Sequence, residues 1–72
     1  MRDQKITTSV DLGASVRRRR GELELTQSQL ADVARVTPRL VGELEHGKPT
    51  AQFEGVLRIL GALGLDVYLR TR

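Results

Sequence analysis

The side chains of this chain that are able to do chemistry are mostly cationic. Arg39 and Lys48 lie within or just after residues 37–45, and arginines fill positions 17–20. Guanidinium and ammonium groups bind phosphate oxygens, and arginine also matches the two acceptors on the major-groove edge of guanine. The chain has no cysteine and a single histidine, His46. It also lacks a Gly-rich phosphate loop and a metal-ligand cluster, so we expect no enzyme activity, no catalytic residue, no metal and no cofactor.

Length and charge predict one small domain that favours a polyanionic partner. The 72 residues carry 12 Lys and Arg against 9 Asp and Glu, a net charge of +3. A domain with an incidentally Arg-rich surface has the same balance, so charge alone does not select nucleic acid. A core of this size is marginal, which favours oligomerisation. No apolar run spans a membrane and residues 1–10 lack a signal-peptide core, so we expect a cytoplasmic, nucleoid-associated protein.

Residues 26–34 predict the first of two short helices. Thr26 is a suitable N-cap, because its side chain accepts a bond from a free amide of the first turn. Leu30, Val33 and Ala34 then recur at helical spacing. Only two residues separate this helix from the next N-cap, so the turn is tight.

Residues 37–45 predict the second short helix. Thr37 is its N-cap, and Pro38 occupies the first helical position, where its missing N–H costs nothing. Val41 and Leu44 form its apolar face. The short turn forces the two helices to cross steeply, which is the arrangement of a helix-turn-helix unit whose second, recognition helix enters the DNA major groove.

A longer helix is expected before this unit, from about Ser9 to about Leu23. Thr8 or Ser9 is its N-cap, and Thr8 with Asp11 resembles a capping box. Leu12, Val16 and Leu23 mark its buried stripe. The arginines at 17–20 are interpreted either as a solvent-exposed face or as phosphate contacts. Arg19 and Arg20 both border the stripe and one of them needs an acidic partner, but periodicity does not choose between them.

A fourth helix is expected over residues 51–63, capped by Thr50 and ended by Gly64. Its apolar arc is wider than one packing stripe needs, which we interpret as a second buried face against a partner chain. The tail 65–70 alternates apolar and polar residues, as a half-buried strand does. Its partner is either the same strand of a second copy, which we favour, or residues 5–8 of its own chain.

The motifs from Leu12 to Leu69 resemble the lambda-repressor-like, Xre-type helix-turn-helix family. The matching positions are Leu12-Gly13, Val16-Arg17, Arg20, Leu25-Thr26-Gln27, Leu30-Ala31, Val36-Thr37, Val41, Leu44-Glu45 and Gly47-Lys48-Pro49-Thr50. The ending RILGALGLDVYLR is similar to that of HipB-type antitoxins. The resemblance implies an all-α bundle of four to five helices with one C-terminal β-strand that pairs across a dimer.

The resemblance also implies a function and partners. HipB-type antitoxins repress their own operon, bind operator DNA at an inverted repeat as homodimers, and bind a HipA-like serine/threonine kinase toxin. We therefore expect a repressor of this kind, with a stand-alone Xre-type regulator as the alternative. The expected organisation is a flexible segment at 1–8, a DNA-binding domain at 9–64 and a dimerisation strand at 65–70.

The resemblance assigns candidate residues to three roles. It implies a structural ion pair between Arg20 and Glu45. The expected dimer contacts are Val56, Ile59, Leu60, Leu63, Leu65, Val67 and Leu69. The expected DNA contacts are Thr26, Gln27, Ser28, Thr37, Pro38, Arg39, Gly42, Glu43 and Lys48.

Among these, Gln27 and Lys48 are expected to bind phosphates, and Arg39 is expected to contact either a base or a phosphate. Two positions depart from the family pattern. Arg35 stands where the turn usually has a glycine at positive φ, and Glu24 stands where glycine is also common. Either Arg35 adopts positive φ, which costs about 1 kcal/mol, or the backbone of this turn follows a different path.

Overall fold

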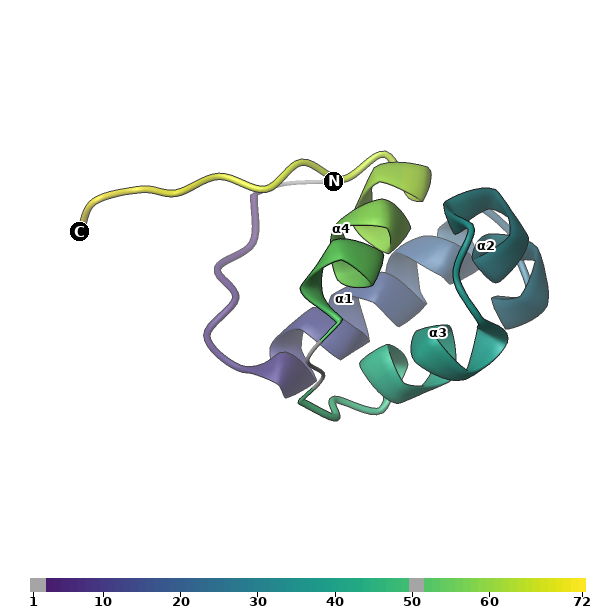
Figure 1. The fold of residues 1–72 in the computed structure, drawn as a ribbon. Helices are drawn as coiled ribbons and strands as arrows, with labels where there is room; N and C mark the ends of the chain where they lie inside the picture. Colours follow the sequence, from purple (N-terminus) through teal and green to yellow (C-terminus); the bar gives the residue numbers. More distant parts are fainter. Residues whose placement is uncertain (1–2, 50–51) are drawn as a thin grey trace.

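The computed structural model describes residues 3–49 and 52–72, and within them it contains four α-helices and no β-strand. They are α1 (Ser9–Glu22), α2 (Gln27–Ala34), α3 (Pro38–Glu45) and α4 (Phe53–Ala62). Figure 1 shows α1 running behind the other helices, with α2 and α3 forming the compact end of the molecule and the chain after α4 extending away from it. Helix α3 packs against α1 and α2, and α2 also packs against α4.

The helix starts follow from the capping residues. Thr8 Oγ1 accepts from the backbone N–H of Asp11, whose carboxylate in turn accepts from the N–H of Thr8, so the expected capping box is formed. Thr26 caps α2 in the same reciprocal way with Gln29. The capping residue expected for α4, Thr50, lies outside the described residues.

Helix α3 begins as expected. Thr37 Oγ1 accepts from the N–H of Leu40 at 3.1 Å, and Pro38 occupies the first helical position. The buried face consists of Leu40, Val41 and Leu44. This three-residue stripe fixes which side of α3 faces the core and therefore which side faces outward.

The turn between α2 and α3 has the left-handed backbone that is usual in the family this sequence resembles. Arg35 has φ 59° and ψ 46°, which is the left-handed region. Glu24, in the loop before α2, is also left-handed at φ 56°. Neither residue is a glycine, so each position costs about 1 kcal/mol that the surrounding packing must offset. Val33, expected on the apolar face of α2, is exposed, and the small Ala31 is buried in its place. Leu23, expected on the buried stripe of α1, is its C-cap and is also exposed.

Gly13 allows α1 to approach the end of α3 closely. A Cβ at this position would collide with the carbonyl oxygen of Leu44 and touch that of Glu45, which are backbone atoms. The two helices therefore meet backbone to backbone at this point. The contact sets how the C-terminal end of α3 sits on α1.

A buried ion pair makes the second connection between α1 and the end of α3. Arg20 Nε donates to Glu45 Oε2 at 2.6 Å, and the second Arg20 amino group donates to Glu45 Oε1 at 2.9 Å. Arg20 also donates to the carbonyl of Leu25 at 2.8 Å, which ties in the loop before α2. The Glu45 side chain is only 3% exposed. Arg19 takes a different role and donates to the carbonyl of Leu63 at the end of α4.

The environment of Glu45 keeps its carboxylate ionised. Burial is the largest influence and pushes the pKa of Glu45 upward, but the hydrogen bonds from Arg20 and Gln27 and the nearby charges of Arg20 and Arg17 outweigh it. The net pKa of Glu45 therefore lies below its ordinary value. The hydrogen bond to Glu45 likewise raises the pKa of Arg20.

The burial of α4 corrects one expectation about its wide apolar arc. The side chains of Val56, Ile59, Leu60 and Leu63 are all buried within the single chain, together with Val16 and the apolar residues of α2 and α3. The arc is wide because α4 fills the centre of a small bundle, so these four residues do not need a partner chain. The exposed large apolar residues of α4 are Phe53 and Leu57.

The tail after α4 does not form the expected strand within one chain. Leu65 packs against the core, but Val67 is 56% exposed and Leu69 is 99% exposed. No backbone hydrogen bond joins residues 65–72 to residues 5–8 in the described part of the chain, and the tail runs outward (Figure 1). An exposed ion pair joins the two ends, with Asp3 and Arg70 3.6 Å apart.

The backbone contact at Gly13 predicts a large effect of adding one methyl group. Gly13→Ala should lower the free energy of unfolding by about 1–3 kcal/mol, because the added Cβ meets rigid carbonyl groups rather than a flexible side chain. Gly21→Ala in the same helix is the control, because its Cβ would meet nothing within 4 Å, and it should stabilise the protein by up to about 1 kcal/mol. Urea unfolding of both variants checks this, and equal effects would contradict the close approach.

The lowered pKa of Glu45 predicts that the ion pair loses its effect in acid. Above the pKa of an unfolded glutamate, about 4.3, the stabilisation is fully present, and it disappears as the pH falls through the lower folded-state pKa. Glu45→Gln should therefore cost about 2 kcal/mol at neutral pH and flatten the decline of stability in acid. Glu22→Gln, in an exposed pair with Arg19, should leave that pH profile unchanged. Thermal unfolding between pH 2 and pH 7 measures both.

Candidate nucleic-acid interface

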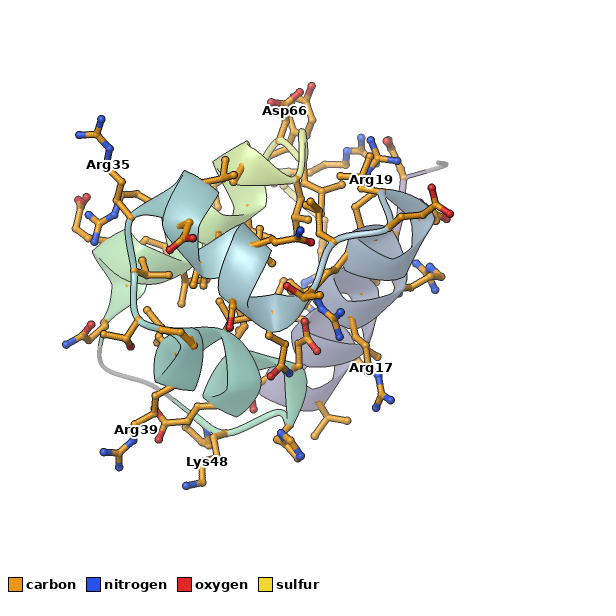
Figure 2. The ribbon with its side chains drawn as sticks, turned by 90° about the vertical axis from the view of Figure 1, so that its right-hand side faces the viewer. Arg17, Arg19, Arg35, Arg39, Lys48 and Asp66 are labelled. Atoms are coloured by element: carbon orange, nitrogen blue, oxygen red, sulfur yellow. The ribbon has the colours of Figure 1, made fainter. Side chains whose placement is uncertain are left out.

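The outward face of α3 is polar and carries several of the expected DNA contacts. Thr37, Pro38 and Arg39 are exposed at the start of the helix, and Gly42 and Glu43 lie half-exposed one turn later. Figure 2 shows Arg39 and Lys48 extending on the same side of the molecule, beyond α3. The buried stripe of α3 thus leaves its opposite side free to meet a ligand.

The side chains on this face surround a shallow hollow of about 390 Å³. Its lining consists of Arg39, Gly42, Glu43, His46 and Lys48. Glu43 Oε2 lies 3.8 Å from Arg39 Nε and 3.7 Å from Lys48 Nζ, so one carboxylate sits between two cations. These pairs are exposed and weak, so both cations remain available to phosphate or base acceptors.

His46 joins this face although the sequence gives it only a minor role. Its Nδ1 lies 2.7 Å from the carbonyl oxygen of Gly42, and because that oxygen only accepts, Nδ1 carries the hydrogen. The bond turns the ring along the C-terminal end of α3. The other ring nitrogen, Nε2, is left as a further polar atom of a side chain that lines the hollow with Lys48.

The start of α2 adjoins the outward face of α3. Ser28 is exposed, and Gln27 is half-buried with its Oε1 3.8 Å from the position that a Cβ on Gly42 would occupy. The amide Nε2 of Gln27 donates to Glu45 Oε1 at 3.2 Å. Free amides of the first helical turn point outward here, which favours an anionic ligand.

The sequence did not predict the hydrogen bond between Gln27 and Glu45. The two residues lie on different helices, and no periodicity or spacing relates them. Their closeness follows from the steep crossing of α2 and α3, so only a three-dimensional arrangement of the unit reveals it. Arg35, at the far end of the turn, points away from Arg39 and Lys48 (Figure 2) and so lies off this face.

Other kinds of site find little support in the described residues. None of them form a group of three or more His, Cys, Asp or Glu side chains that is able to hold a metal ion. Among the described helices, none is both long enough and apolar enough to cross a membrane.

Comparisons with known proteins agree with this geometry. The model of a family described as a helix-turn-helix domain matches residues 11–72. An uncharacterized HTH-type transcriptional regulator, y4mF of Sinorhizobium fredii (strain NBRC 101917 / NGR234), is 47% identical over 64 residues, which cover 89% of this chain and 84% of the relative.

Solved structures share the arrangement of the helices. A chain in the structure of a HipA–HipB–O2–O3 complex is 23% identical with a TM-score of 0.85, covering 96% of this chain and 97% of that one. A HipB–O4 20mer complex gives 24% identity and a TM-score of 0.80 over 96% and 97% of the chains. At these identities the likeness shows the fold alone.

A third structure is more similar in sequence. The clp gene regulator ClgR from Corynebacterium glutamicum is 31% identical with a TM-score of 0.71, covering 86% of this chain and 80% of that one. The family is one of DNA-binding regulators and not an enzyme class. On its helix arrangement, its matched family model and its regulator relatives, the chain belongs to the helix-turn-helix family of Xre-type, DNA-binding transcriptional regulators.

Proposed function

We propose that this transcriptional regulator is a sequence-specific repressor that binds an inverted repeat in operator DNA as a homodimer and serves as a HipB-like antitoxin. The observation that carries the DNA-binding part is the outward face of α3, where Arg39 and Lys48 flank a shallow hollow opposite the buried stripe. An α-helix that exposes one polar face in this way fits the major groove.

The proposed contacts divide into base readout and phosphate binding. We assign base readout to Arg39, because its side chain is 85% exposed near the start of α3 and a guanidinium matches the two acceptors of guanine. Lys48, after α3, and the polar residues at the start of α2 (Thr26, Gln27 and Ser28) bind phosphates on either side. Thr37, Pro38, Gly42 and Glu43 complete the surface that enters the groove.

The proposed dimer uses the exposed apolar residues near the C-terminal end of the chain. Phe53 and Leu57 on α4 and Val67 and Leu69 on the tail are exposed in the single chain. Pairing of the tails of two copies would provide backbone hydrogen-bond partners along residues 66–70 and would cover this apolar surface. A two-fold axis there predicts half-sites about one helical turn apart.

The antitoxin role rests on the likeness to HipB. The chain shares its fold with HipB chains, one of them in a complex with HipA, and this supports a HipA-like kinase as the partner. The alternative is a stand-alone Xre-type regulator, which the similarity to y4mF and ClgR favours.

Affinity capture from the native cells separates the two roles. The tagged chain is purified in high salt, which removes proteins bridged only by DNA, and co-purifying proteins are identified by mass spectrometry. A kinase in equimolar amount supports the antitoxin. Recovery of the chain alone contradicts the antitoxin role and supports the stand-alone regulator.

Arg39 is predicted to determine sequence preference. Arg39→Ala should weaken binding to the preferred duplex, isolated with the wild-type protein from a randomised library, by about 1–3 kcal/mol and relax the preference at one base pair. Arg35→Ala is the control, because Arg35 carries the same charge but points away from this face. Anisotropy titrations and repeated selection measure both effects. An unchanged preference in Arg39→Ala would exclude base readout by this residue.

The tail is predicted to hold the dimer together. Val67→Asp should shift the protein to the monomer and sharply lower its affinity for the duplex, because a charge would be buried between two paired tails. Tyr68→Asp, on the other side of the alternating tail, should leave the dimer intact. Analytical ultracentrifugation distinguishes the two states, and a dimeric Val67→Asp protein would rule out the proposed pairing.

A further inference from the structure

Gln27 belongs at once to the outward face and to the buried network behind it. Its Nε2 donates to Glu45 Oε1 at 3.2 Å, and the same oxygen accepts from Arg20 at 2.9 Å. The Glu45 side chain is almost completely buried, whereas Gln27 lies half-exposed at the first position of α2. The buried carboxylate of Glu45 at the end of α3 therefore holds the partly exposed side chain of Gln27 at the start of α2.

The chemistry of the pair fixes the orientation of the amide. An ionised carboxylate only accepts hydrogen bonds, and the pKa of Glu45 lies below its ordinary value. The amide group must therefore turn its nitrogen and not its oxygen toward Glu45. One amide hydrogen of Gln27 is used in this bond. The second has no acceptor within the described part of the chain and diverges from the first by about 120° in the planar amide.

The network that holds the amide is itself anchored. Arg20 binds both oxygens of Glu45 and also the carbonyl of Leu25, one residue before the N-cap of α2. The helix start that carries Gln27 and the carboxylate that orients its amide are thus attached to the same guanidinium. This arrangement fixes the position of the Gln27 amide relative to the first turn of α2.

We propose that Glu45 is a positioning residue for DNA binding, which holds the Gln27 carboxamide so that its second N–H is presented to a phosphate. The inference rests on the proposed DNA contact at the start of α2. A free glutamine side chain loses much rotamer freedom when it binds. Ordering it in the free protein removes that cost from the binding step and strengthens the phosphate contact without adding a charge.

A double-mutant cycle tests this role. Gln27→Ala should weaken binding to the preferred duplex about fivefold, the loss typical of one hydrogen bond. Glu45→Gln should cause a smaller loss in the same direction. Its one carbonyl oxygen, at the position that Arg20 and Gln27 both contact, carries no full charge and holds the Gln27 amide less firmly than the carboxylate does. The double variant should be no weaker than Gln27→Ala alone, because the two changes remove the same contact.

Each outcome of the cycle decides a different question. If Glu45→Gln weakens binding equally in the wild-type and Gln27→Ala proteins, Glu45 acts through the fold alone and the positioning role is wrong. If Glu45→Gln changes DNA binding in neither background, the positioning role is also wrong. Failure of the wild-type protein to bind any duplex would instead refute the proposed function. Titrations are made well below the unfolding temperature of every variant, and the salt dependence should be the same throughout because no cation is removed.

The wild-type protein gives an independent answer if Glu45→Gln does not fold. The side-chain amide of Gln27 should be as rigid as the backbone in heteronuclear NOE measurements on the DNA-free protein. An amide that moves freely on the nanosecond timescale before DNA is added would overturn the proposal.

Discussion

The bidentate ion pair between Arg20 and Glu45 is the interaction on which the rest of this structure depends. It joins the last turn of α1 to the last residue of α3, and its 2.6 Å and 2.9 Å hydrogen bonds are largely buried. Removing one partner would leave a buried charge without compensation, which is far costlier than losing a surface pair. Together with the close backbone contact at Gly13, the ion pair fixes how the end of α3 packs on α1.

The position of α3 decides what the outward face is able to do. Its apolar stripe of Leu40, Val41 and Leu44 faces the core, so Arg39 faces outward and Lys48 joins it from the loop that follows. The same arrangement places the start of α2 beside α3, where free helix amides favour anions. The proposed base readout and phosphate binding would thus share one scaffold, which suits the family of transcriptional regulators to which the chain belongs.

The sequence predicted the helical part of this fold well, because the local signals are strong. Thr8, Thr26 and Thr37 each cap a helix as expected, and Pro38 begins α3. The expectations about α4 and the tail were less successful. A wide apolar arc on a helix does not reveal whether its side chains fill the core of their own chain or contact a partner chain. A tail with the alternating pattern of a strand forms no strand by itself, because its backbone groups need a second strand to pair with. The bond between Gln27 and Glu45 was missed because it depends on how two helices cross.

The most direct test of the central claim is an NMR titration of the ¹⁵N-labelled protein with its preferred duplex. We predict that the largest amide shift changes occur at residues 26–28 and 37–48, where α2 begins and α3 faces outward, and that Arg35 changes little. Shift changes centred on Phe53, Leu57 and the tail, with α3 unaffected, would contradict the account and place the DNA on a different face.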